Sequence, residues 1–315
     1  MLAFLFPGQG AQSDGFLHRL PPHPVVQATI AEASDVLSFD VLTIDTPEAL
    51  RSSVAVQIGL VVAGVATARR LADEGFDIAL TAGLSVGAYA AAVACDALAF
   101  ADALRLVKKR AELMERAYPS GYGLSAIEGL TEHQVEALAG DAAGDEASRV
   151  YIGNVNAPRQ IVVAGSDAAL DAFNVCALAA GAHRAMRLAV SVPSHCELLA
   201  QASDELLAYA ADIPFRTPRA VYVGNRTARP LRTAEAIRGD LATNMRYTVR
   251  WFDALTGIIE LGATVLVEAP PGQVLTSIAH SAYPDVPALS AGTMPDERLI
   301  YLLRKRFDVR SPQES

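Results

Sequence analysis

One serine in this chain lies in a setting that suits nucleophilic chemistry. The sequence GLSVG at residues 83–87 follows a short apolar run, residues 76–82, and precedes a run of small residues, 89–94. Glycines two positions before and after a serine permit the sharp strand-to-helix turn that exposes its Oγ. We therefore predict that Ser85 is a nucleophile. The alternative is a tightly packed turn whose serine only caps the following helix.

A serine nucleophile needs a base, and His195 is the best candidate among the six histidines. It lies in the sequence SVPSHC, residues 191–196, where we expect a strand to give way to a helix over residues 194–210. In the first turn of a helix the dipole disfavours the imidazolium, which suits a neutral general base. The alternative is a histidine that caps this helix beside Ser194.

An oxyanion formed at Ser85 needs two hydrogen-bond donors. The backbone N–H of Val86, directly after the nucleophile, is the expected first donor. Gln9 is the expected second, because it lies in the glycine-flanked loop PGQG, residues 7–10, at the end of an apolar strand. The alternative for this loop is an ordinary strand-to-helix turn.

The elements expected to position these residues alternate between strands and helices, which indicates a parallel α/β domain. The expected strands are residues 2–6, 76–82, 220–223 and 264–268, and the expected helices are residues 56–71, 89–94, 101–117, 194–210, 234–245, 252–261 and 273–280. We assign this domain to residues 1–123 and 191–315, which makes it discontinuous in sequence.

Residues 124–190 show a different order, which predicts an inserted subdomain. Strand, helix, two strands, helix and strand follow one another, and this βαββαβ order is typical of a ferredoxin-like unit. Because the insert ends directly before the histidine motif, we expect a cleft between it and the larger domain, a common place for ligands. Within the insert, residues 142–146 are expected to form a variable loop.

Composition limits the function classes. The formal charge of −9 disfavours a nucleic acid or an anionic membrane as partner. Three cysteines without a C-x-x-C pair favour a reducing compartment over disulfides or zinc, and no cluster of ligands predicts a metal. The apolar residues 58–68 are judged too short to span a bilayer, and no basic segment precedes the first apolar run. We expect a cytoplasmic protein.

Five motifs occur in a fixed order along the chain. They are FPGQGAQ at residues 6–12, GLSVG at 83–87, LVKKR at 106–110, NVNAPRQ at 154–160 and SVPSH at 191–195. Together they resemble the malonyl-CoA:acyl carrier protein transacylases, and the resemblance extends as far as VRW at residues 249–251. It implies an α/β-hydrolase-like parallel-sheet domain with an inserted ferredoxin-like subdomain, in agreement with the pattern of elements.

The resemblance implies a Ser–His dyad, with Ser85 as nucleophile and His195 as base. Gln9 and the Val86 amide are implied as the oxyanion hole. The histidine of this family is oriented by a main-chain acceptor instead of an aspartate. Asn244 falls at the position of the family's glutamine whose carbonyl orients the histidine.

The resemblance further implies that Arg110 binds the free carboxylate of a malonyl group, with Leu84 and Asn156 as additional substrate-binding residues. A planar guanidinium can hold a carboxylate through two parallel hydrogen bonds, which a lysine cannot reproduce. Such a site favours malonyl over acetyl by roughly 2–4 kcal/mol. The alternative is that KKR at residues 108–110 is a solvated basic face.

Two positions depart from the family elbow, which usually has histidine before the serine and glutamate after the second glycine. This chain has Leu84 and Ala88 there. The elbow GLSVGA and the sequence YPSGYG at residues 118–123 most resemble the epsilon subunit of malonate decarboxylase. That subunit loads malonyl onto the decarboxylase's own carrier protein, so other decarboxylase subunits are further expected partners.

The implied reaction is malonyl transfer from malonyl-CoA to the phosphopantetheine thiol of an acyl carrier protein through a malonyl-serine. No bound cofactor is expected, because the CoA thioester is the substrate and the phosphopantetheine belongs to the partner.

Two alternatives stay open: an acyl-CoA thioesterase or hydrolase, and a non-catalytic docking subunit of a carrier-protein complex. An acidic carrier protein needs a positive patch, for which the candidates are Lys108, Lys109, Arg184 and Arg187, unless these are scattered solubilising charges.

Overall fold

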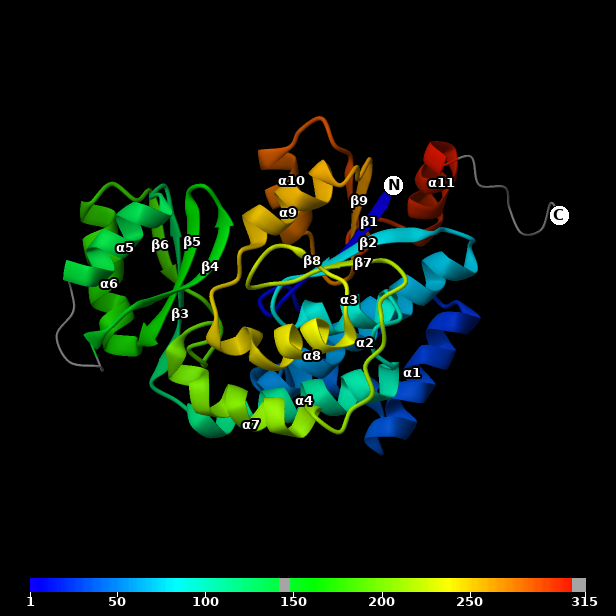
Figure 1. The fold of residues 1–315 in the computed structure, drawn as a ribbon, viewed down its shortest axis with the longest axis horizontal. Coiled ribbons are helices and arrows are strands. Elements are labelled where there is room, and N and C mark those ends of the chain that lie inside the picture. Colours follow the sequence, from blue (N-terminus) through cyan, green and yellow to red (C-terminus); the bar gives the residue numbers. More distant parts are fainter. Residues whose placement is uncertain (142–147, 308–315) are drawn as a thin grey trace.

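The computed structural model, shown in Figure 1, describes residues 1–141 and 148–307 and contains two β-sheets. The six-stranded sheet has the order β10-β9-β1-β2-β7-β8, and only its edge pair β7–β8 is antiparallel. Its strands are β1 (Leu2–Phe6), β2 (Ile78–Gly83), β7 (Val221–Val223), β8 (Pro230–Leu231), β9 (Val265–Glu268) and β10 (Ala288–Ser290). The predicted parallel α/β domain is therefore confirmed.

The central strand β1 is buried on both faces because helices cover both sides of the sheet. Leu2, Phe4 and Phe6 belong to the core on one side, and Ala3 and Leu5 to the core on the other. The first side carries α1 (Pro24–Leu37), α2 (Ser53–Asp73), α3 (Gly87–Ala94), α4 (Phe100–Ala117), α7 (Ala200–Ala210) and α8 (Ala234–Thr243), and the second α9 (Trp251–Glu260) and α10 (Val274–Ala282). A last helix, α11 (Asp296–Phe307), completes the described chain.

Helix α2 corrects one expectation about membranes. It has 21 residues and is long and apolar enough, by length and composition, to cross a bilayer. The expectation from the sequence, that this apolar stretch is too short to span a membrane, is therefore wrong. However, 89% of its most apolar window is buried inside the protein. Neighbouring α1, α3 and α4 pack around it, which is the setting of a core helix.

The small antiparallel sheet confirms the predicted βαββαβ unit. Its strand order is β4-β5-β3-β6, and helices α5 and α6 cover it to form a core around Ile127, Ile161 and Phe173. Its elements are β3 (Tyr122–Glu128), α5 (Glu132–Asp141), β4 (Tyr151–Ala157), β5 (Gln160–Ser166), α6 (Asp167–Ala179) and β6 (Arg184–Arg187). The expected loop at residues 142–146 lies outside the described residues, and the division at residues 124 and 190 stays a prediction.

The small sheet is joined to the large domain through the segment that precedes α9. The Val155 N–H donates to the Val249 carbonyl at 2.9 Å, and the Val249 N–H donates to the Gly153 carbonyl at 2.8 Å. Thr248 Oγ1 donates to the Ile152 carbonyl at 2.8 Å. Strand β4 is thereby fixed against residues 248–249.

The structure differs from the predicted elements in several regions. The helix expected over residues 194–210 is a short 3-10 turn, Glu197–Leu199, followed by α7, so residues 194–196 are not helical. Helices α1 and α11 and strands β8 and β10 were not predicted. Helix α8 ends at Thr243 and a 3-10 turn, Asn244–Arg246, follows it.

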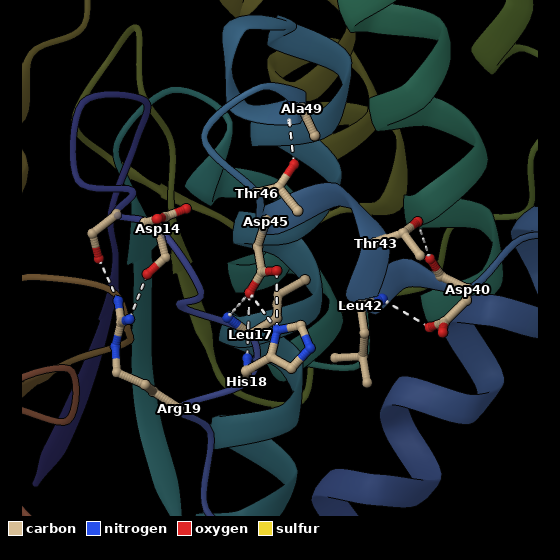
Figure 2. A network of polar contacts seen from close by, with 11 residues as sticks. Asp14, Leu17, His18, Arg19, Asp40, Leu42, Thr43, Asp45, Thr46 and Ala49 are labelled. Carbon is tan, nitrogen blue, oxygen red and sulfur yellow. Dashed lines mark hydrogen bonds and ion pairs between the residues drawn. The ribbon is translucent and has the colours of Figure 1, made fainter.

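The segment after the PGQG loop is held by one buried carboxylate (Figure 2). Asp45 is 1% exposed and accepts hydrogen bonds from the Leu17 N–H at 2.8 Å and the His18 N–H at 3.3 Å. The His18 ring lies 3.0 Å from the same carboxylate, while His23 accepts from the Val25 N–H at the start of α1. These two histidines therefore make contacts within the scaffold.

Candidate active site

The Ser85 turn connects β2 to α3 and has the strained backbone of a nucleophile elbow. Ser85 has φ 55°, a left-handed conformation that is uncommon for a residue with a side chain. A Cβ at Gly83 would lie 2.0 Å from the Gly87 carbonyl carbon, and one at Gly87 would lie 2.2 Å from the Phe6 carbonyl oxygen. Both glycines are therefore required for the close approach of backbone to backbone at this turn.

Ser85 and His195 form a hydrogen-bonded pair. His195 Nε2 lies 2.7 Å from Ser85 Oγ, and His195 Nδ1 lies 2.8 Å from the Asn244 carbonyl oxygen. Because the carbonyl can only accept, Nδ1 carries the proton, and Nε2 is left to accept from the serine hydroxyl. The main-chain carbonyl of Asn244 thus orients the ring.

The cause of the histidine's neutral state differs from the one expected from the sequence. His195 precedes the helical turn and has φ 69°, so no helix dipole acts on it from its own element. Burial of the ring, followed by the positive charge of Arg110, lowers the pKa of His195 from 6.5 to about 4. At neutral pH the ring is therefore an uncharged base.

Arg110 points from α4 into the same cluster and is fully buried. Its Nη1 donates to Gln57 Oε1 at 2.6 Å, and its Nη2 donates to Ser85 Oγ at 3.1 Å and to Asn244 Oδ1 at 3.4 Å. All three partners are neutral, its Nε has no partner, and no ion pair joins Arg110 to a carboxylate among the described residues. A buried cation without a counter-charge is costly, which makes this a place for an anionic group of a substrate.

Gln57 is a site residue that sequence reasoning missed. It is fully buried in α2, where its Oε1 accepts from Arg110 and its Nε2 donates to Gln9 Oε1 at 3.2 Å. Gln9 Nε2 in turn lies 3.4 Å from Ser53 Oγ. The one available signal was an amide side chain within the otherwise apolar sequence VAVQIGLVV at residues 54–62.

Of the two expected oxyanion donors, Val86 lies within the elbow and Gln9 lies in the neighbouring PGQG loop. In the part of the chain that the structure describes, the backbone N–H groups of Val86 and Gln9 donate to no other group. The PGQG loop approaches the elbow so closely that a Cβ at Gly8 would lie 2.7 Å from Leu84 Cδ2 and 2.9 Å from the Leu84 carbonyl oxygen. Their role as an oxyanion hole stays a prediction.

Of the remaining predicted site residues, Asn244 and Leu84 lie at the dyad or the elbow, whereas Asn156 has no hydrogen bond to the dyad among the described residues. Asn244 joins the cluster through its side chain as well, because its Nδ2 donates to the Ser85 carbonyl at 3.3 Å. Leu84 contributes its side chain to the elbow–loop contact and is half-buried. Asn156 is buried in β4 with its Oδ1 unpartnered, and no hydrogen bond among the described residues joins it to the dyad.

At least three surface hollows lie between the small sheet and the large domain. One of about 770 Å³ lies between the β4–β5 turn and the helices α9 and α10, and its walls contain none of the described site residues. One of about 400 Å³ is lined by His195, Tyr247 and Ile152. The reactive groups are therefore identified by their mutual geometry, and His195, although buried, also contributes to the wall of the hollow of about 400 Å³.

Among the described residues no group of three or more His, Cys, Asp or Glu side chains is placed to hold a metal ion. Arg184 and Arg187, two candidates for a docking patch, form ion pairs with Glu128 at 3.6 Å and Asp171 at 3.4 Å. These pairs reduce the positive charge available there, and the docking patch stays a prediction.

Comparison with known proteins supplies the family for this geometry. The acyl transferase domain matches residues 3–308. The chain belongs to the acyl transferase family. This acyl transferase is 40% identical over 283 residues to the malonyl CoA-acyl carrier protein transacylase of Salmonella typhimurium, covering 88% of the chain and 91% of the relative. It is 38% identical over 282 residues to the Escherichia coli protein of the same name, covering 88% and 91%.

Solved structures give the same result. The acyl transferase matches the malonyl CoA-acyl carrier protein transacylase of Coxiella burnetii with a TM-score of 0.91 at 33% identity, covering 97% of both chains. It matches a malonyl-transacylase solved in complex with a type II PKS acyl-carrier protein with a TM-score of 0.90 at 35% identity, covering 96% of this chain and 99% of that one. The fold class is thereby confirmed, and the chain is an acyltransferase of the malonyl-CoA:acyl carrier protein transacylase family.

Proposed function

We propose that this acyl transferase moves a malonyl group from malonyl-CoA to the phosphopantetheine thiol of an acyl carrier protein. The observation that carries the proposal is the buried Arg110, which contacts the nucleophile and has no carboxylate partner among the described residues. Relatives of this chain named malonyl CoA-acyl carrier protein transacylases support the substrate pair.

The guanidinium has one edge suited to the substrate carboxylate. Gln57 holds Nη1 at 2.6 Å, whereas Nε is unpartnered and Nη2 makes longer contacts of 3.1 and 3.4 Å. A carboxylate can bind the Nε–Nη2 edge through two parallel hydrogen bonds. An acetyl group leaves this edge empty, so malonyl is the favoured acyl group.

In the first half-reaction, Nε2 of His195 takes the proton of Ser85 Oγ as this oxygen forms a bond to the thioester carbonyl carbon. The negative charge on the carbonyl oxygen is stabilised by the backbone N–H groups of Val86 and Gln9. The carbon–sulfur bond then breaks, and the CoA thiolate receives the proton from His195. The product is a malonyl-serine ester.

In the second half-reaction, the phosphopantetheine thiol of the carrier protein gives its proton to His195 and attacks the ester carbonyl. The carbon–oxygen bond breaks, Ser85 Oγ recovers the proton, and malonyl leaves as a thioester of the carrier protein. Neither half-reaction oxidises or reduces any group, so no bound cofactor is required. A ping-pong kinetic pattern follows from the shared covalent intermediate.

We further propose that the acyl transferase acts as the epsilon subunit of a malonate decarboxylase, with other subunits of that enzyme as partners. The elbow GLSVGA, with Leu84 and Ala88, supports this assignment. Cys95, Cys176 and Cys196 are all free thiols, which supports a reducing, cytoplasmic location.

The proposal is tested by intact mass after mixing the protein with malonyl-CoA or acetyl-CoA, with Ser85→Ala as control. We expect a malonyl adduct that requires Ser85. The phosphopantetheine thiol of a holo acyl carrier protein should discharge this adduct. An adduct lost rapidly to water instead would identify a hydrolase. Absence of an adduct from either thioester would overturn the transferase and favour a docking subunit.

A further inference from the structure

The Ser85 backbone N–H is bound by a side chain from a distant strand end. It donates to Asn225 Oδ1 at 2.8 Å, and both residues are buried. Asn225 follows β7, the neighbour of β2 in the large sheet, so the nucleophile's turn and its amide acceptor lie at the ends of paired strands. Because Ser85 has a left-handed φ, this bond holds a backbone conformation that is otherwise unfavourable.

Asn225 is itself fixed by its backbone. Its N–H lies 3.1 and 3.3 Å from the two carboxylate oxygens of Asp240, and its carbonyl accepts from the Arg250 N–H at 2.9 Å. Tyr222 donates to the same Asp240 carboxylate at 2.8 Å. The acceptor that faces Ser85 is thus rigidly placed by groups that do not touch the dyad.

The side-chain amide of Asn225 makes its one close hydrogen bond among the described residues with Ser85, and Asp240 lies nearby. Asn225 Nδ2 has no hydrogen-bond partner among the described residues, so Oδ1 is the atom that makes the side chain's polar contact. Rotating the amide by half a turn would bring an N–H donor against the Ser85 donor. Only the observed orientation satisfies the buried amide of Ser85.

We propose that Asn225 is a positioning residue, which holds the Ser85 turn so that Oγ lies in line with His195 Nε2. The inference rests on the proposed function for its acyl-transfer readout, but it concerns the reactivity of Ser85 toward any acylating group. Because the Ser85 N–H already donates to Asn225, it is not available to an oxyanion. The proposed oxyanion donors are therefore Val86 and Gln9.

The test compares Asn225→Ala with Asn154→Ala, a truncation of another buried asparagine. Two rates are measured: formation of the malonyl-enzyme in a single turnover, and labelling of Ser85 by a fluorophosphonate. We expect Asn225→Ala to slow both rates by about ten- to a hundredfold, in line with a buried donor left unpaired, with the malonyl-CoA KM within about twofold. Asn154→Ala is expected to change each rate by less than about twofold.

Asn225→Asp retains an acceptor oxygen and is expected to react at least about threefold faster than Asn225→Ala. If the alanine variant does not fold, Asn225→Leu replaces it in this comparison, because leucine fills a similar volume without an acceptor. Equal rates for the aspartate variant and the variant without an acceptor would overturn the inference, as would wild-type labelling of Asn225→Ala. Wild-type protein that is labelled but forms no malonyl adduct would contradict the proposed function and leave the Asn225 comparison intact.

Discussion

Arg110 Nη2 lies 3.1 Å from Ser85 Oγ, so the buried cation touches the nucleophile before any acyl group enters. The same hydroxyl lies 2.7 Å from His195 Nε2, to which it donates. A single side chain therefore contacts the reacting oxygen and has an unpartnered Nε, which we propose binds the distal carboxylate of the substrate. In the proposed reaction, selection of the acyl group and placement of the nucleophile are linked through Arg110.

Arg110→Ala is expected to lower kcat/KM for malonyl-CoA by about a hundredfold or more, because the carboxylate loses its buried partner. Transfer of acetyl should rise relative to malonyl, since the removed cation no longer needs an anion. The measurement is kcat/KM for both thioesters. Arg105→Ala, on an exposed part of the same helix, is the control and should leave the ratio unchanged. An equal loss for both acyl groups would contradict the role.

Gln57→Glu is expected to inhibit malonyl transfer without destabilising the protein. The new carboxylate would lie beside Arg110 Nη1, now 2.6 Å from the Gln57 oxygen, and would supply the missing counter-charge. Because the substrate carboxylate then competes with an internal one, kcat/KM for malonyl-CoA should fall about ten- to a hundredfold. Thermal unfolding of the variant should show a Tm no lower than wild type. An unchanged kcat/KM would show that Gln57 does not set the charge of this site.

The pH dependence of acylation should reflect the buried histidine. With the pKa of His195 lowered to about 4, the base remains neutral well below pH 6.5, so kcat/KM should not fall between pH 7 and about 5.5. Arg110→Gln removes a positive charge that lowers this pKa and should shift the acid limb to higher pH. The pH profile of kcat/KM for acetyl-CoA measures both. A wild-type acid limb centred near 6.5 would be incompatible with this environment.

The same shift links stability to pH. The folded-state pKa lies below the unfolded value, so the unfolded chain alone binds a proton between about pH 6.5 and 4. The contribution of His195 to the free energy of unfolding is therefore complete above pH 6.5. It is lost as the pH falls toward 4, by roughly 3 kcal/mol in total. His195→Gln should flatten the dependence of the unfolding free energy on pH in this window, measured by urea denaturation.

Gly8→Ala is expected to lower kcat with little change in KM. The added Cβ would meet the Leu84 carbonyl at 2.9 Å, so the PGQG loop must move away from the elbow and carry the Gln9 amide with it. Loss of one oxyanion donor costs about a hundred- to a thousandfold in kcat. Gly140→Ala is the matched control, because a Cβ there meets nothing within 4 Å. Wild-type kcat in Gly8→Ala would place the oxyanion donor elsewhere.

Much of the site could be predicted because its chemistry is carried by local motifs. The glycines around Ser85 predict a strained turn, and the structure contains it. Arg110 and His195 follow from motif resemblance, and their contacts with Ser85 agree with it. Element types were predictable where the apolar pattern is clear, as in the continuous apolar run of β1 and the amphipathic repeat of α4.

The missed features depend on contacts between distant segments. Gln57 and Asn225 act through neighbours far along the chain, so no local spacing marks them. The helix predicted to start at residue 194 fails because His195 takes a left-handed φ and is held by the Met245 carbonyl at 2.7 Å. Here a tertiary hydrogen bond overrides the helical periodicity of the sequence.

The position of β1 in the sheet has a consequence for synthesis of the chain. β1 pairs on one edge with β2 and on the other with β9. The ribosome makes β9 only after every residue proposed for the dyad, the oxyanion hole and the carboxylate site. On the ribosome, the reactive groups are therefore all present while the strand that carries the PGQG loop still has one open edge. Such late pairing favours slow acquisition of activity, and a nascent chain that ends before Val265 should contain every reactive group and still not turn over.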